Sequence, residues 1–136
     1  MRNLLQINTG ALSPELIKAV AKVSDVALDK EYGYGLSTDP DSFGWRANKL
    51  SVTYGLHEFF YGEGLGIDDV EAVASAIHDG WSSAVYTIKD PVYLSKPHKK
   101  ANRLLLANTP YSKLSESEKE KDKVVARAII DFLKSY

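Results

Sequence analysis

A cluster of basic side chains near residue 100 is the part of this sequence best suited to chemistry. Lys96, His98, Lys99, Lys100 and Arg103 put four permanent cations and one histidine into eight positions. They lie at the expected start of a helix, where exposed backbone N–H groups also attract anions. We expect Lys99, Lys100 and Arg103 to hold the phosphate groups of a ligand. A solvated basic helix face is the simpler alternative.

Aromatic side chains supply a second candidate surface. Phe43, Trp45, Arg46 and Tyr54 share one expected helix, and Tyr111 follows the basic cluster in the sequence. Aromatic faces beside a guanidinium can stack a nucleotide base, by roughly 1–3 kcal/mol per base. We therefore expect Trp45, Arg46 or Tyr111 to frame a ligand. Packing in the core is the more common role of large aromatic residues and is the favoured alternative here.

His78 and Trp81 lie one turn apart on another expected helix. Trp81 falls on the apolar stripe of that helix, so core packing is its expected role. His78 lies one position off the stripe, on the face that also carries Ser75 and Ser82. It is either a polar ligand contact or a structural hydrogen-bonding group, and the structural role is favoured.

Catalytic and metal chemistry find no support in the sequence. The three histidines, at positions 57, 78 and 98, lack the paired spacing of a zinc site. Asp39 and Asp41 begin like a calcium loop, but Leu50 stands where the closing glutamate belongs. No local nucleophile signature occurs. We therefore expect no catalytic residues, no metal, no cofactor and no enzymatic activity.

Composition limits the classes of partner. The chain has 136 residues, a formal net charge of −1 and no cysteine. That length suits one domain with a core, and that charge gives no general attraction to nucleic acid. Without cysteine there is no disulfide. Neither a signal peptide nor a membrane span is evident, so we expect a cytoplasmic protein without membrane contact. A homo-oligomer, most simply a C2 dimer, remains open.

Apolar periodicity and capping residues predict an all-α fold with about five helices. The expected helices cover residues 14–30, 40–61, 69–89, 97–107 and 116–136, with the N-caps Ser13, Asp39, Asp68 and Ser115 where a cap is evident. Residues 4–7 fit either a short strand or an extended arm. We expect one domain over residues 1–136, with a helical first half of about residues 1–66 and a second half of about residues 67–136.

The junction before the last helix is marked most clearly. Pro110 lacks an N–H group and restricts Thr109 to extended geometry, so the preceding helix should stop near Asn108. Ser115 then fits the N-cap position, and Glu118 has the spacing of a capping box.

An ordered series of residues runs through the second half of the chain: His78 and Trp81, then Arg103, Pro110-Tyr111, Leu114-Ser115-Glu116, Glu118-Lys119 and Asp122. This series resembles the RyR domain, the repeat of ryanodine receptors that also occurs in small bacterial and bacteriophage proteins. The resemblance covers roughly residues 69–133. Between Trp81 and Arg103 the chain lacks elements of the receptor repeats, and in this it looks more like the phage branch.

The resemblance implies a helical recognition domain without catalysis. We expect a phage-type accessory protein, in the host cytoplasm if phage-encoded, that acts against host defences by binding a small phosphate-bearing molecule such as a nucleotide-derived signal. The alternative is a protein–protein interaction module that binds a host protein through the mixed-charge face of its last helix. Nucleic acid is the least favoured partner because of the overall charge.

Overall fold

The chain folds into helices joined by short connections. The computed structural model describes residues 12–37, 39–61, 69–88 and 97–135. Over these ranges it has five α-helices and one 3-10 turn: α2 (Pro14–Tyr32), α3 (Phe43–Tyr61), α4 (Val70–Thr87), α6 (Pro97–Asn108), η2 (Tyr111–Lys113) and α7 (Glu116–Ser135). None of these ranges contains a strand, so the predicted all-α fold is confirmed. Residues 4–7, the expected strand or arm, lie outside them.

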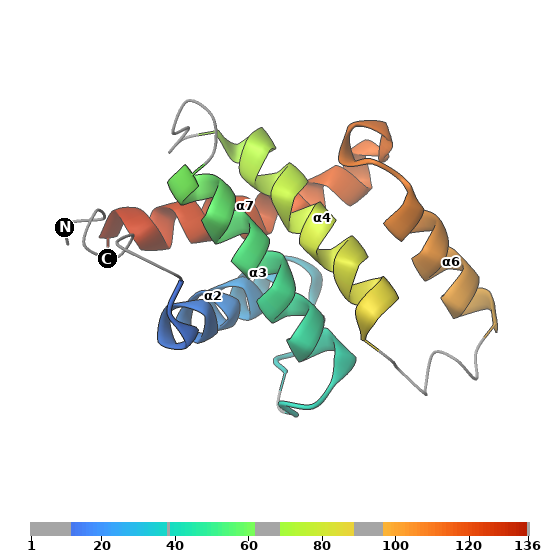
Figure 1. Ribbon diagram of the computed structural model, residues 1–136, viewed down its shortest axis with the longest axis horizontal. Helices are drawn as coiled ribbons and strands as arrows, with labels where there is room; N and C mark the ends of the chain where they lie inside the picture. Colours follow the sequence, from blue (N-terminus) through green and yellow to red (C-terminus); the bar gives the residue numbers. More distant parts are fainter. Residues whose placement is uncertain (1–11, 38, 62–68, 89–96, 136) are drawn as a thin grey trace.

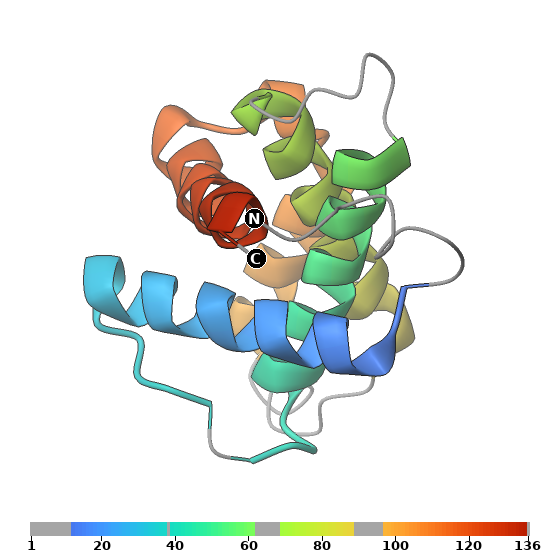
Figure 2. The same ribbon diagram turned by 90° about the vertical axis from the view of Figure 1, so that its left-hand side faces the viewer.

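The helices pack as a bundle around α4 and α7. In Figure 1, α4 lies between α3 and α6, and α7 crosses behind α3 and α4. Figure 2 shows α2 crossing one side of the bundle, beneath the end-on view of α7. The contacts agree, because α3 packs chiefly on α4, whereas α2 packs on α3 and α7. Helix α6 contacts α4 on the outer side.

Two helix starts form as the sequence predicts. The Ser13 hydroxyl accepts a hydrogen bond of 3.1 Å from the Leu16 N–H at the start of α2. The Ser115 hydroxyl accepts one of 3.3 Å from the Glu118 N–H at the start of α7. Each bond satisfies a backbone donor that has no partner within its helix. In a capping box the Glu118 carboxylate would also turn back to the start of the helix. In the structure it pairs with Lys121 at 3.4 Å.

Two other starts were predicted wrongly. Helix α3 begins at Phe43 and not at Pro40. The Asp39 carboxylate accepts from the Asp41 N–H at 2.9 Å, which forms a turn, and Ser42 accepts from the Trp45 N–H at 3.1 Å instead. Aspartate stabilises turns and helix caps through the same local hydrogen bond, so its sequence position could not separate the two.

The N-cap of α4 is Asp69, one residue after the predicted Asp68. Its carboxylate accepts from the Ala72 N–H at 3.0 Å. Adjacent aspartates both satisfy the sequence rule for an N-cap, and only the backbone conformation selects one. The helix ends at Thr87, two residues before the predicted end.

One hydrophobic core joins both halves of the chain. Its members come from α2, α3, α4, α7 and the η2 segment, and its fully buried side chains include Val20, Val52, Leu56, Val73, Ile129 and Leu133. Helix α7 closes this core against both α2 and α4. Among the helices described, none is long and apolar enough to cross a bilayer.

Candidate functional site

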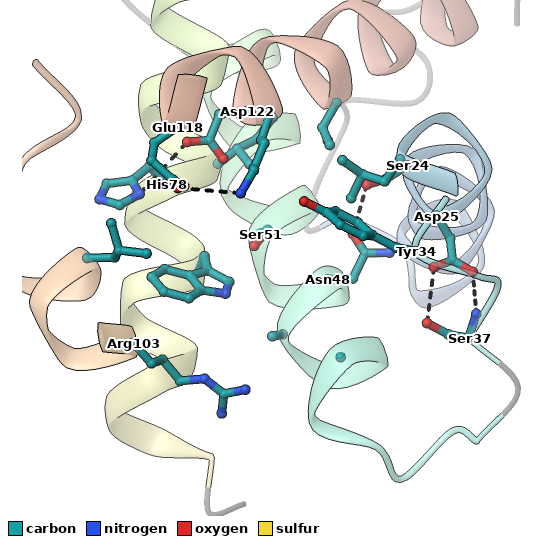
Figure 3. Close-up of a pocket in the computed structure, with 18 of the residues that line it drawn as sticks. Ser24, Asp25, Tyr34, Ser37, Asn48, Ser51, His78, Arg103, Glu118 and Asp122 are labelled. Carbon is teal, nitrogen blue, oxygen red and sulfur yellow. Dashed lines mark hydrogen bonds and ion pairs between the residues drawn. The ribbon is translucent and has the colours of Figure 1, made fainter. Parts of the chain in front are cut away.

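A cavity of about 640 Å³ lies where five helices meet. Its wall includes Asp25 of α2, Asn48 of α3, His78 of α4, Arg103 of α6 and Asp122 of α7, and Tyr34 and Ser37 from the segment after α2. Figure 3 shows these side chains around a common space, with Arg103 at one end and Asp122 and Glu118 at the other. Cavities of roughly 300–1,000 Å³ with an apolar lining and few polar groups are typical of small-molecule sites.

The apolar part of the wall includes a large aromatic ring. Trp81 lines the cavity and is only partly buried, so it does not pack wholly in the core as expected. Its ring lies 6.1 Å from that of His78, with the two planes 25° apart. Leu28, Ile77 and Leu106 are among the apolar residues of the wall. The indole therefore offers a surface on which a flat ring can stack.

The cavity carries charges of both signs. Among the described residues of the wall, Arg103 and Lys121 are the cations, and Asp25, Glu118 and Asp122 are the carboxylates. The Arg103 guanidinium lies 3.8 Å from the centre of the Phe43 ring, which fixes it by a cation–π contact. Because the acidic groups outnumber the basic ones, an anionic ligand group is favoured only near the Arg103 end.

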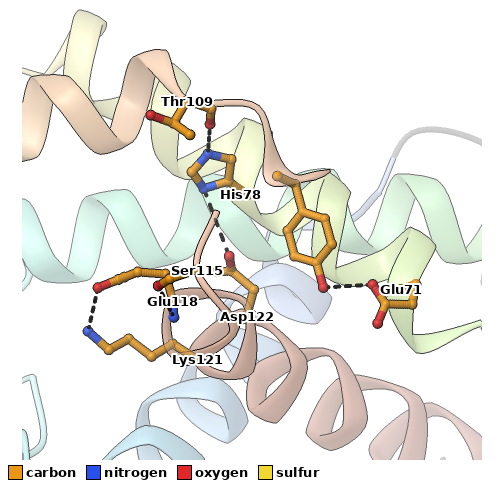
Figure 4. A network of polar contacts seen from close by, with 8 residues as sticks. Glu71, His78, Thr109, Ser115, Glu118, Lys121 and Asp122 are labelled. Atoms are coloured by element: carbon orange, nitrogen blue, oxygen red, sulfur yellow. Dashed lines mark hydrogen bonds and ion pairs between the residues drawn. The ribbon is translucent and has the colours of Figure 1, made fainter. Parts of the chain in front are cut away.

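A polar network forms the end of the cavity opposite Arg103. His78 is buried, and its Nε2 lies 2.7 Å from the Thr109 carbonyl oxygen. A carbonyl only accepts, so Nε2 carries the proton and donates it. The other ring nitrogen, Nδ1, lies 3.8 Å from the Asp122 carboxylate. A dashed line marks this contact in Figure 4. The backbone after α6 therefore sets the orientation of the imidazole towards Asp122.

The Asp122 carboxyl is strongly perturbed by its surroundings. Burial and, to a lesser degree, the negative charge of Glu118 raise the pKa of Asp122 to about 7, whereas Lys121 acts in the opposite direction. The physical cause is loss of hydration, which disfavours the ionised carboxylate. Perturbed acids inside cavities are a common mark of functional sites.

The residues predicted from the sequence do not converge on one site. Of the seven, His78 and Arg103 line the cavity. Trp45 and Tyr111 are buried in the hydrophobic core. Arg46 is exposed on α3 and lies outside the cavity wall.

The two predicted lysines are placed differently. Lys100 is exposed on α6, three residues before Arg103, and is not part of the cavity wall. Lys99 belongs to the same helix, but its side chain lies outside the described part of the structure. Of the two members of this expected phosphate-binding cluster whose side chains are described, Arg103 lines the wall and Lys100 does not.

Tyr111 has a structural contact. Its hydroxyl donates to the Glu71 carboxylate at 2.9 Å, and burial raises the pKa of the phenol. Glu71 also binds Lys123 at 2.8 Å, and these two hydrogen bonds, first that of Lys123, lower the pKa of Glu71. Tyr111 thereby joins the η2 turn to α4.

The mixed-charge face of α7 is largely paired within the chain. Besides Lys123 with Glu71, Arg127 binds Glu120 at 2.8 Å. Lys119 lies 3.6 Å from Glu116. Many charges on this face of α7, which was predicted to bind a host protein, are therefore already paired within the chain.

Sequence reasoning missed Asp122, Asn48 and Tyr34 as cavity residues. Asp122 sits within a run of alternating glutamates and lysines, where composition cannot distinguish an inward carboxylate from a solvated one. The available signal was the resemblance, because six of the residues that carry it line the cavity: His78, Trp81, Arg103, Leu114, Glu118 and Asp122. They come from α4, α6, α7 and the turn between α6 and α7.

The described ranges contain no group of three or more metal-ligating side chains close enough together to hold a metal ion.

Comparisons of the chain with protein-family models, with characterised proteins and with solved structures find no match.

Proposed function

We propose that this chain is a non-catalytic binding protein that takes up a small phosphate-bearing molecule, such as a nucleotide-derived signal, in the cavity between its helices. The observation that carries the proposal is the wall itself: a guanidinium at one end, a partly buried indole that lines the cavity, and polar groups at the far end. A phosphate at Arg103 and a base on Trp81 would use both features.

The position of Lys100 supports a phosphate at this end. It precedes Arg103 by three residues on α6, and residues at this spacing are neighbours on a helix surface. A ligand with more than one phosphate would therefore meet Lys100 as it leaves the cavity. The resemblance to the phage branch of the RyR domain supports an accessory role against host defences, in which sequestering such a signal is sufficient.

Calorimetric titration tests this function. Nucleoside monophosphates, cyclic dinucleotides and ADP-ribose are titrated into the full chain, and we expect one of them to bind with micromolar affinity. Arg103→Gln should weaken that binding by about 10- to 100-fold, because a charge-assisted hydrogen bond contributes roughly 1.5–3 kcal/mol.

Arg46→Gln is the matched control. Arg46 is the same residue type, exposed on α3 and outside the cavity wall, so the affinity should not change. Absence of binding across the panel at high micromolar concentrations would reject the proposal. Binding that depends on Arg46 but not on Arg103 would place the ligand elsewhere.

A further inference from the structure

One carboxylate in the cavity lacks a partner that suits it. Asp25 accepts two hydrogen bonds from Ser37, from its N–H at 2.7 Å and its hydroxyl at 3.0 Å. Glu118 pairs with Lys121 at 3.4 Å. Within the described part of the chain nothing donates a hydrogen bond to Asp122, and the nitrogen atom His78 Nδ1 lies 3.8 Å from its carboxylate. Its side chain is only 18% exposed, so solvent compensates poorly.

His78 adds a second acceptor at the same place. Its Nε2 proton is committed to the Thr109 carbonyl, so Nδ1 of the neutral ring carries a lone pair that faces Asp122. Two lone-pair-bearing groups side by side repel each other unless a donor lies between them. Asp122 and His78 together therefore offer three acceptor atoms: the two Asp122 oxygens and His78 Nδ1.

We propose that this end of the cavity, formed by Asp122 and His78, binds the N–H edge of a guanine base, so that the ligand is a guanine nucleotide. The inference rests on the proposed function and names its ligand class. Guanine has three N–H hydrogens on one edge, one on N1 and two on the exocyclic N2. Two of them can pair with the carboxylate and the third can reach the imidazole nitrogen, which matches the acceptor count.

The other residues of the cavity wall follow the order of base and phosphate in a nucleotide. Trp81 follows His78 by one turn of α4, and the planes of the two rings are 25° apart, so a base bound at Asp122 can extend along the indole face. Arg103 lies at the opposite end from Asp122, where the phosphate of the same nucleotide would lie (Figure 3). Adenine presents an amino group next to a ring acceptor on the equivalent edge, and that acceptor would face the carboxylate.

Recognition of this kind depends on pH through Asp122. The charged and titratable groups around it are His78 on α4, Glu118 and Lys121 on α7, Arg103 on α6, and Asp25 and Tyr34 across the cavity. Tyr111 on η2 also senses its charge. Only ionised Asp122 accepts both N–H groups, and its carboxyl has a pKa of about 7. Guanine affinity should therefore rise with pH to a plateau above neutrality and fall towards tenfold per pH unit below it.

The experiment titrates GMP, IMP, AMP and XMP into the full chain between pH 5.5 and 8.5. We expect GMP to bind best, IMP about tenfold more weakly because it lacks the N2 amino group, and AMP weaker still. Asp122→Asn should reverse the order between GMP and XMP, because its amide donates to the xanthine O2 while its carbonyl accepts from N1–H. A variant that has lost its fold would bind neither nucleotide, so a preference for XMP cannot result from misfolding.

Asp131→Asn is the control variant, since Asp131 is exposed on the same helix and outside the cavity. It should retain both the GMP preference and the pH profile. The phosphate of the nucleotide also loses its second proton near pH 6, and this affects binding to the native chain and to both variants alike. The contribution of Asp122 is therefore the difference between the affinity–pH profiles of the native chain and of Asp122→Asn.

Three outcomes would overturn the inference. Nucleotide binding that requires Arg103 but prefers AMP, or ignores Asp122→Asn, would leave the proposed function standing and reject guanine recognition. Free arginine binding more tightly than GMP would show that this end recognises positive charge. Absence of binding by every nucleotide would reject both proposals together.

Discussion

The burial of the Asp122 carboxyl makes the stability of the protein depend on pH. Its carboxyl is mostly buried, and the described residues offer it no hydrogen bond. A group whose pKa is higher in the folded than in the unfolded chain binds extra protons on folding, so the contribution of Asp122 to stability is greatest in acid. Between its ordinary pKa of 3.8 and its folded value of about 7, that contribution declines as pH rises.

Asp122→Asn should therefore stabilise the protein in alkaline solution. The neutral amide has the same shape and avoids the loss of carboxylate hydration, so we expect the free energy of unfolding at pH 8 to rise by on the order of 2–4 kcal/mol. At pH 4 the native carboxyl is protonated, and the two proteins should have nearly equal stability. Urea unfolding at both pH values measures the difference.

The opposite result would have a definite meaning. A variant that is less stable than the native chain at pH 8 would show that the ionised Asp122 carboxylate makes a stabilising contact that the amide cannot replace. Asp131→Asn, an exposed change on the same helix, should leave stability within about 0.5 kcal/mol at either pH.

At the scale of elements, the crossing of α3 and α4 positions the cavity. The backbones meet at Gly80, where a Cβ atom would lie 2.8 Å from both the Leu50 carbonyl oxygen and the Ser51 Cα. Ser51 and Trp81 line the cavity immediately beside this crossing. Because residue 80 has no side chain, the backbones of α3 and α4 can come into direct contact at this crossing. The close crossing sets the positions of Ser51 and Trp81 in the cavity wall.

Gly80→Ala should force the helices apart. The clashing atoms belong to the backbone and cannot rotate away, so overpacking should lower the free energy of unfolding by about 1–3 kcal/mol despite the better helix propensity of alanine. Gly44→Ala is the matched control, because it lies in α3 with open space around its Cβ position. That change should instead raise stability by about 0.5–1 kcal/mol. Equal effects of the two changes in thermal unfolding would contradict the close crossing.

At the scale of the whole molecule, the two halves share their interior. Helix α7, near the C-terminus, packs on α2 near the N-terminus, and the core cluster contains residues of both. Neither half could unfold without exposing apolar surface of the other. Small domains with one continuous core usually unfold in a single cooperative step.

The two tryptophans can test this cooperativity, since Trp45 lies in the core of the first half and Trp81 lines the cavity in the second. Trp81→Phe leaves Trp45 as the fluorescent probe, and Trp45→Phe leaves Trp81. In each variant we expect the urea midpoint from fluorescence to coincide with that from circular dichroism of the helices. Distinct midpoints within one variant would show that the halves unfold separately.

The sequence by itself determined the all-α fold and most helix boundaries, because capping and apolar periodicity act over three or four residues. Ser13 and Ser115 cap helices as predicted. The errors at Asp39 and Asp68 arose where a turn or a neighbouring aspartate satisfies the same local rule. The cavity was less predictable: the sequence singled out His78 and Arg103, but the aromatic partners it proposed for them are part of the core.

Only the tertiary structure decided which side chains meet. Lys99, Lys100 and Arg103 are close in sequence, but of their described side chains only Arg103 reaches the cavity. Asp122 joins His78 across 44 positions because α7 packs against α4. Local interactions select a helix and its caps, whereas the packing of apolar faces over the whole chain fixes which polar groups are enclosed together. That packing turns Asp122, together with Glu118 and Lys121, into the wall of the cavity.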